Sequence, residues 1–358
     1  MKHRVERHAE GLAAALLVLA GVLGCARPST LFVPPAASVA IVPAPADASP
    51  PPVFAPAPAP VDSAPLAPEP PPPPSVSLAD ARRILFADDA SAPTCADASI
   101  AAAVHCFLAA RYSSDPRAAA VATSLYDATG DVAGLSSAET MEGGFRGVLH
   151  LVPELPVGAR RKHLEWVASS VTDYDDFFQR LTEGVPQLPR YRWHALSLRF
   201  MRSVGRTTPS AYAEGWSIAY NVDGSLNTSR DAVRELLFHE IFHLNDSAHG
   251  DWSKPALGPI FDGLIARCHA STACLRPYAP SSTLVRGGTY YAFQPNNGDA
   301  VHEYAAELAI RYYEEERAIL HGEPPLPRFK CGPTENGRAW TLLVNEFFGG
   351  IDRTPPCP

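Results

Sequence analysis

The sequence HEIFH at residues 239–243 constrains this chain more than any other stretch. The residues around it recur with the spacing of an apolar helix, and residues four apart lie on one face of a helix. His239 and His243 can therefore direct their imidazoles at one metal ion, and Glu240 can take a proton from a water that the metal activates. The alternative is that both histidines are hydrogen-bonded core or surface residues. Two histidines and a glutamate in this order on an apolar helix favour the metal site.

The flanking residues predict where this helix begins and which residues it buries. Thr228 is suited to an N-cap, and Asp231 three positions later completes a capping box. The apolar residues that follow with helical spacing are Val233, Leu236, Leu237, Ile241, Phe242 and Leu244.

Residues 1–25 have the pattern of a targeting segment. Basic residues open the chain, and the apolar run at 11–23 is short for a membrane span. The sequence VLGC at 22–25 resembles a bacterial lipoprotein signal, which implies that Cys25 is lipidated and anchors the protein to a membrane. By the same resemblance, Ala26 favours the outer membrane of a bacterial envelope. The alternative is an ordinary secretory signal cleaved near Ala26, and both interpretations place the protein outside the cytoplasm.

Residues 26–75 are rich in proline and alanine and hold about half of the 37 prolines. Such a segment buries too little surface to fold, so it is predicted to be a disordered, extended tether. The rest is long enough for one large or two small domains. We divide it into a helical prefix at 76–140 and a metal-binding domain at 141–358. The formal net charge is −8 without a basic stripe, so no nucleic-acid partner is expected.

Six of the seven cysteines remain once Cys25 is assigned to the lipid. An even number in an exported chain indicates disulfides. Nearest-neighbour pairing is the simplest, although other connectivities stay open, and it gives Cys95–Cys106, Cys268–Cys274 and Cys331–Cys357. A cysteine metal site is the rival interpretation, but the chain contains no C-x-x-C spacing.

The periodic patterns predict a mixture of helices and strands. Helices are expected at 79–86, 99–111, 116–127 and 160–181, and strands at 147–152, 192–203 and 212–222. A further helix after the HEIFH motif runs through residues 302–313, with Glu303 and Glu307 on one face. This mixture predicts an α+β fold: a helical prefix, a small mixed sheet, and two helices that meet at the metal.

Two residues compete to be the third metal ligand. His249 completes the spacing H-E-x-x-H-x-x-G-x-x-H, which resembles the motif of metzincin peptidases. However, Asp246 stands where that motif has glycine, and Asp adopts a left-handed backbone less readily. Metzincins also need a methionine after the motif, whereas all three methionines here precede it. Asp246 is predicted either to hold a ligand histidine from behind or to end the helix.

Glu303 is the second candidate, and we favour it. The sequence EYAAE at 303–307 resembles the E-F-x-A-E segment of peptidases related to anthrax lethal factor, within the gluzincin group. This resemblance implies that Glu303 binds zinc and that Glu307 orients a ligand histidine. The alternative is a solvated helix face, which we predict for the glutamates at 314–316.

The resemblance to zinc peptidases with an H-E-x-x-H motif, those related to anthrax lethal factor among them, assigns two further parts of a cleft. A tyrosine shortly before the Glu303 helix would stabilise the oxyanion, and we choose Tyr291, with Tyr290 next. Both could instead be packing aromatics. The strand predicted at 212–222 would form the upper edge of the cleft, where an extended peptide pairs with it.

These resemblances imply a zincin-like domain and a lipid-anchored zinc metallopeptidase outside the cytoplasm. Zn²⁺ would be held by His239, His243 and Glu303, and Glu240 would act as general base on a peptide or protein substrate. One alternative is a non-catalytic envelope lipoprotein that holds zinc or a peptide. Others are a structural lipoprotein in which HEIFH is a coincidence, and a zinc hydrolase that cleaves another substrate.

Overall fold

The computed structural model describes residues 75–358 except 88–91, 96–98, 144–146, 270, 286–287 and 295–298. All described residues belong to one compact unit. The predicted signal peptide with Cys25, and the predicted tether apart from its last residue, lie outside the described residues. The predicted domain boundaries stay predictions.

The helices expected at 79–86, 99–111, 116–127 and 160–181 form within about two residues at each end. The helix expected at 302–313 is longer, at 300–320, and the helices at 253–268, 272–275 and 334–347 were not predicted. The described residues form nine helices in all. They are α1 (Leu78–Phe86), α2 (Ile100–Arg111), α3 (Pro116–Thr129), α4 (Arg161–Thr182), α5 (Arg230–Ala248), α6 (Ser253–Cys268), α7 (Thr272–Leu275), α8 (Ala300–Leu320) and α9 (Thr334–Phe347). Short 3₁₀ turns occur at η2 (Gly158–Arg160), η3 (Arg276–Tyr278), η4 (Tyr291–Phe293) and η5 (Phe329–Cys331).

The strands form one mixed sheet, so the predicted α+β class is confirmed. They are β1 (Val132–Leu135), β2 (Glu139–Glu142), β3 (Val148–Pro153), β4 (Ser197–Ser203), β5 (Ala211–Glu214) and β6 (Ser217–Asn221). Their order is β2-β3-β4-β6-β5, and β1 pairs in parallel with the first half of β4. The β4–β6 pair is also parallel, whereas the β2–β3, β3–β4 and β5–β6 pairs are antiparallel. The side chains of Tyr212 and Glu139 meet although β5 and β2 are the two edges, so the sheet is curled.

The single strand predicted at 212–222 is wrong. Gly215 and Trp216 both have positive φ, 55° and 58°, and they turn the chain back between β5 and β6. The period-2 pattern continues across this two-residue turn, so it does not reveal the break, although the glycine was an available signal. The strand immediately before the HEIFH helix, β6, is therefore internal to the sheet, and β5 is the edge strand.

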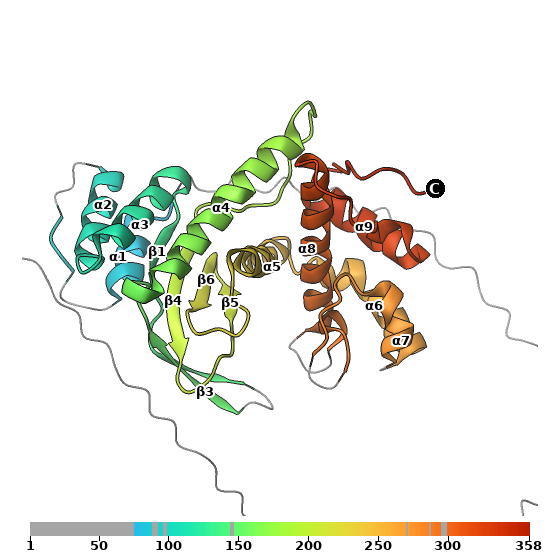
Figure 1. The fold of residues 1–358 in the computed structure, drawn as a ribbon, viewed down its shortest axis with the longest axis horizontal. Coiled ribbons are helices and arrows are strands. Elements are labelled where there is room, and N and C mark those ends of the chain that lie inside the picture. Colours follow the sequence, from blue (N-terminus) through green and yellow to red (C-terminus); the bar gives the residue numbers. More distant parts are fainter. Residues whose placement is uncertain are drawn as a thin grey trace, which may run out of the picture. The chain divides into compact units, whose positions relative to one another are not determined.

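The main core lies between one face of the sheet and the helices. Figure 1 shows α4 crossing this face and α5 lying between the sheet and α8. Leu198 and Phe200 of β4 and Tyr220 of β6 belong to the same buried cluster as α4 and α5. The apolar stripe predicted for α4 is buried throughout: Leu164, Val167, Val171, Phe177, Phe178 and Leu181. A smaller cluster around Met201 lies on the other face.

The helical prefix shares this core, because β1 pairs with β4 and the α1–α3 residues belong to the main cluster. Its junction with the sheet is polar and buried: Asp131, which is fully buried, accepts a hydrogen bond from the backbone N–H of Leu196 (2.6 Å). The three nearest-neighbour disulfides are confirmed. Within the described part of the chain, no helix combines the length and the apolar character that crossing a bilayer requires.

Candidate metal centre

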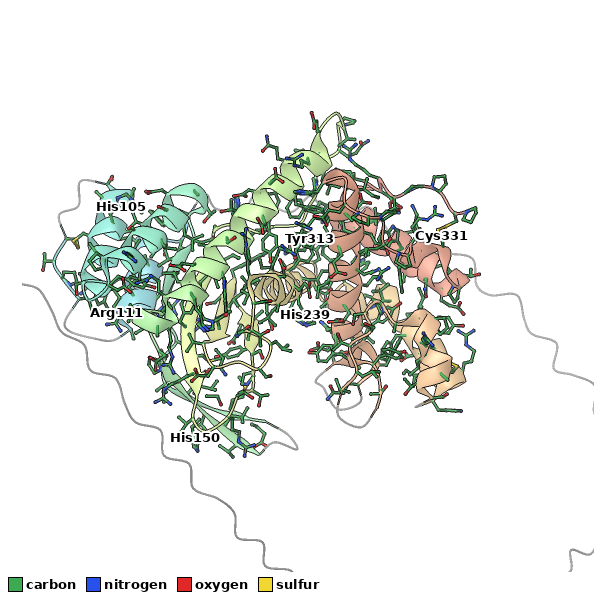
Figure 2. All side chains as sticks on the ribbon, viewed as in Figure 1. His105, Arg111, His150, His239, Tyr313 and Cys331 are labelled. Carbon is green, nitrogen blue, oxygen red and sulfur yellow. A yellow bond between two sulfur atoms is a disulfide. The ribbon has the colours of Figure 1, made fainter. Side chains whose placement is uncertain are left out.

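Helix α5 carries the HEIFH motif into the middle of the fold. It begins one residue later than predicted, because Ser229, not Thr228, is the N-cap, and its side chain accepts a hydrogen bond from the Ala232 backbone. Its apolar residues anchor it in the core, while His239 and Glu240 are only 6% and 7% exposed. Figure 2 shows His239 on the side of α5 that faces α8.

Helix α8 brings the carboxylates to this side of α5. Asp299 caps its first turn through the Val301 backbone N–H, and Glu303 and Glu307 follow on one face. The small residues between and after them are fully buried: Ala305, Ala306 and Ala309. Because alanine side chains are short, they let the two helices approach each other closely.

Three ligand atoms converge between the helices. His239 Nε2 lies 3.0 Å from His243 Nε2 and 3.2 Å from Glu303 Oε2. His243 Nε2 lies 3.9 Å from Glu303 Oε1. One ligand atom from each of the three residues fits within a mutual distance of 4.8 Å. In a tetrahedral zinc site the ligand atoms are ~3.3 Å apart, so the residues fit a metal ion of that size.

The electrostatics of the group favour a cation. Burial by itself lowers the pKa of His239, but hydrogen bonds with Glu303 and Glu307 raise it well above its ordinary range. Burial opposes ionisation of Glu303, yet the hydrogen bond and charge of His239 bring the pKa of that carboxyl to about 2. Burial and the neighbouring His239 lower the pKa of His243 to about 4. The site thus stabilises one positive charge where the ligand atoms meet.

Comparisons of the chain with models of protein families, with curated proteins and with solved structures find no match. Support for the site therefore comes from the arrangement of its side chains. The chain has a buried group of two histidines and one glutamate that can bind a metal ion.

Glu307 and Glu240 flank the ligands. Glu307 is 8% exposed, and its Oε1 lies 3.4 Å from His239 Nδ1, the ring nitrogen that points away from the other ligands. This is the position that the sequence predicted for a carboxylate orienting a ligand histidine. Glu240 follows His239 on α5, and burial raises the pKa of its carboxyl to about 7, with Glu303 adding to the rise and His239 opposing it.

Tyr291 belongs to the site, whereas Tyr290 is packed beside it. The Tyr291 side chain hydrogen bonds with Glu303, and its ring centre is 5.9 Å from that of His239. Tyr290 is 9% exposed and belongs to the main core. The loop before α8 therefore contributes a hydroxyl directly beside a ligand.

The structure does not bring His249 to the other histidines. Helix α5 ends at Ala248, and His249 Nδ1 lies 2.6 Å from Glu346 Oε1 on α9. The metzincin-like spacing is therefore present in the sequence, but the third histidine is directed to a different helix.

Asp246 lies near the end of α5 and contacts two other helices, while its predicted role behind a ligand histidine stays a prediction. It is fully buried, accepts hydrogen bonds from the backbone and hydroxyl of Ser253 at the start of α6, and lies 2.9 Å from His302 Nδ1. Its carboxylate therefore joins the end of α5 to α6 and to the first turn of α8.

Sequence reasoning missed two features near α8. The exposure predicted for the glutamates at 314–316 is wrong for two of them, because Glu315 is 2% and Glu316 0% exposed. Arg311, four residues before Glu315 and 2.6 Å from it, was an available signal. The other is Ser281, whose hydroxyl donates to Glu307 Oε2, and nothing in the local sequence indicates this contact.

Proposed function

We propose that this chain is a zinc metallopeptidase of the gluzincin kind with a zincin-like fold. The observation that carries the proposal is the convergence of His239, His243 and Glu303, with Glu240 adjacent. Two imidazole nitrogens and one carboxylate oxygen are a ligand set of catalytic zinc, in which the fourth position takes water or substrate. The carboxyl of Glu303, whose pKa is lowered to about 2, supplies a negative charge that a cation can balance.

Each residue of the site would have a defined task. Zinc held by these residues would supply Lewis acidity, which would lower the pKa of a water molecule so that a nucleophile is available near neutral pH. Glu307 keeps the proton of His239 on Nδ1, so that Nε2 presents its lone pair with the nitrogen of His243 and the carboxylate of Glu303. Glu240 accepts the proton that the attacking water loses and delivers it to the leaving amine.

Tyr291 would complete the chemistry, and β5 would hold the substrate. The Tyr291 hydroxyl donates a hydrogen bond to the oxyanion that develops on the attacked carbonyl. Among the described strands β5 pairs only with β6, and it lies against α5. Its outer edge can therefore bind an extended peptide as an added strand.

The location proposed is outside the cytoplasm, with a lipid on Cys25 as membrane anchor. The signal-like sequence at residues 1–25 supports export, and the three disulfides are consistent with an oxidising compartment. The proline-rich residues 26–75 would act as the tether between the anchor and the folded unit.

Metal analysis and peptide cleavage on the same preparations test the proposal. The purified full chain and its Glu240→Gln variant are assayed for zinc content and for cleavage of a mixed peptide library. The proposal predicts near-stoichiometric zinc in both proteins and cleavage by the unmodified chain alone. Zinc without cleavage in the unmodified chain would favour a non-catalytic binding protein. The absence of zinc from both would overturn the proposal.

A further inference from the structure

The segment that precedes α8 folds back on itself beside the metal centre. The backbone N–H of Tyr291 donates to Thr283 O and that of Val285 to Thr289 O, both at 2.9 Å, and Leu284 forms a bridge with Tyr290. These antiparallel contacts bring the two ends of the segment, Ser281 and Tyr291, to the same end of a hairpin. We call the described residues of 281–291 the clamp hairpin.

Both ends of the clamp hairpin reach carboxylates of α8. Tyr291 hydrogen bonds with Glu303, and the Ser281 hydroxyl donates to Glu307 Oε2. Glu303 and Glu307 lie one helical turn apart. One hairpin therefore contacts both the proposed zinc ligand and the residue proposed to orient His239.

The two oxygens of Glu307 have different partners. Oε2 receives the hydroxyl of Ser281, and Oε1 faces His239 Nδ1 at 3.4 Å. The terminal torsion of a glutamate is broad, so one contact alone leaves the plane of the carboxylate poorly fixed. A second hydrogen bond on the opposite oxygen fixes that plane and aims Oε1 at the imidazole.

Because Glu307 is buried, water cannot readily replace the hydrogen bond from Ser281. Glu307 is 8% exposed, so water has little access to its carboxylate. A buried carboxylate oxygen that loses its donor either remains unsatisfied or rotates towards another donor. Rotation would weaken the hold on His239 and disturb the direction of its Nε2 lone pair.

We propose that Ser281 is a positioning residue of the metal centre: its hydroxyl orients Glu307, which in turn holds His239 for the metal. This inference rests on the zinc binding in the proposed function, but it does not depend on catalysis. It assigns a task to a residue outside the HEIFH and EYAAE motifs, on a segment that supplies no metal ligand.

The test measures Zn²⁺ affinity by competition with a chromophoric chelator, using the full chain. Ser281→Ala is expected to weaken Zn²⁺ binding roughly tenfold, at the lower end of what loss of a partner behind a metal ligand causes. Ser281→Thr, which keeps the hydroxyl, restores the affinity. The matched control is Ser282→Ala, because Ser282 is the next residue and is exposed, and it leaves the affinity unchanged.

A double-mutant cycle separates positioning from a general structural role. If Ser281 acts through Glu307, Ser281→Ala has no further effect on Zn²⁺ affinity in a Glu307→Ala background. The melting temperature of each metal-depleted variant shows whether the fold is intact. A wild-type affinity for Ser281→Ala, or effects that add in the double variant, would overturn this inference alone. A full chain that binds no Zn²⁺ would overturn the proposed function and this inference with it.

Discussion

Two regions of the molecule pair a histidine with a glutamate from a later helix. At the candidate metal centre, His239 of α5 faces Glu303 of α8, with Nε2 and Oε2 3.2 Å apart. At the end of α5, His249 faces Glu346 of α9, with Nδ1 and Oε1 2.6 Å apart. Both histidine side chains are buried, at 8% and 1% exposure, so burial does not distinguish the two regions.

The neighbours of each pair make the difference. His239 has a second imidazole beside it, His243, and a second carboxylate, Glu307. Glu346 instead has Arg190 3.0 Å from the oxygen that contacts His249. A guanidinium already balances that carboxylate, so a metal cation would meet a positive charge there. The charge of the neighbours therefore distinguishes the two pairs: Glu307 adds a carboxylate beside His239, whereas Arg190 balances the carboxylate of Glu346.

The largest expected effect is on Zn²⁺ affinity, and it distinguishes Glu303 from Glu346. Glu303→Ala removes a ligand and is predicted to weaken Zn²⁺ binding by about 100-fold or more, because zinc sites lose affinity steeply with each lost donor. Glu346→Ala should leave the affinity unchanged. Chelator competition on both variants measures this. Loss of Zn²⁺ binding with Glu346→Ala would show that the second region also holds metal.

The second effect is on stability. His249→Ala removes a buried imidazole that hydrogen bonds with Glu346, and it is predicted to lower the free energy of unfolding by ~2 kcal/mol, because the Glu346 carboxylate loses a partner. Zinc content should stay the same. Denaturant unfolding measures the change, with the exposed His150→Ala as control, which is expected to change it by less than about 0.5 kcal/mol. Loss of zinc in His249→Ala would revive the metzincin-like assignment.

An aromatic ring accompanies each histidine and offers a third test. Tyr291 lies beside His239, whereas Phe347 lies 4.7 Å from His249 between ring centres. Tyr291→Phe makes the first region resemble the second, and it is predicted to lower the peptide cleavage rate roughly tenfold with little change in Zn²⁺ affinity. Tyr290→Phe is the matched control. Equal losses in both variants would indicate a packing role for the tyrosines.

The smallest expected effect is on the pH dependence of stability. It follows from a comparison of two glutamates at opposite ends of α8. The pKa of Glu303 is lowered to about 2, whereas burial and the nearby Asp352 raise that of Glu316 to about 8. Folded Glu316 therefore keeps a proton that the unfolded chain releases above its ordinary pKa of 4.5. The unfolding free energy then falls as pH rises from 4.5 towards 8, by about 1 kcal/mol between pH 6 and pH 7.

Unfolding at several pH values tests this sign. Glu316→Gln should remove that part of the pH dependence. Glu323→Gln, which changes an exposed residue just after the end of α8, should leave it unchanged. A Glu316→Gln variant with the same slope as the unmodified chain would contradict the raised pKa.

Local signals predicted much of the fold. The helices at 79–86 and 160–181 have their own apolar periodicity, and each disulfide joins two cysteines that follow one another in the chain, so neither required knowledge of the tertiary structure. The division of 212–222 into β5 and β6 was missed because a two-residue turn preserves the alternation of side chains.

The site was predictable to the extent that each helix carries its own residues. His239 with His243, and Glu303 with Glu307, are pairs four residues apart, so each pair was visible within one helix. The contact of His249 with Glu346 depends on where α5 ends and on which residues of α9 lie beside it, which is tertiary information. The contact of Ser281 with Glu307 spans 26 residues and depends on how the clamp hairpin meets α8.

The most direct test of the central claim is a crystal structure of the full chain with zinc, with diffraction data recorded on both sides of the zinc absorption edge. We predict one anomalous difference peak between His239, His243 and Glu303, at about 2.0–2.2 Å from each ligand atom. A peak at the His249–Glu346 pair, or no peak between α5 and α8 in zinc-saturated crystals, would contradict it.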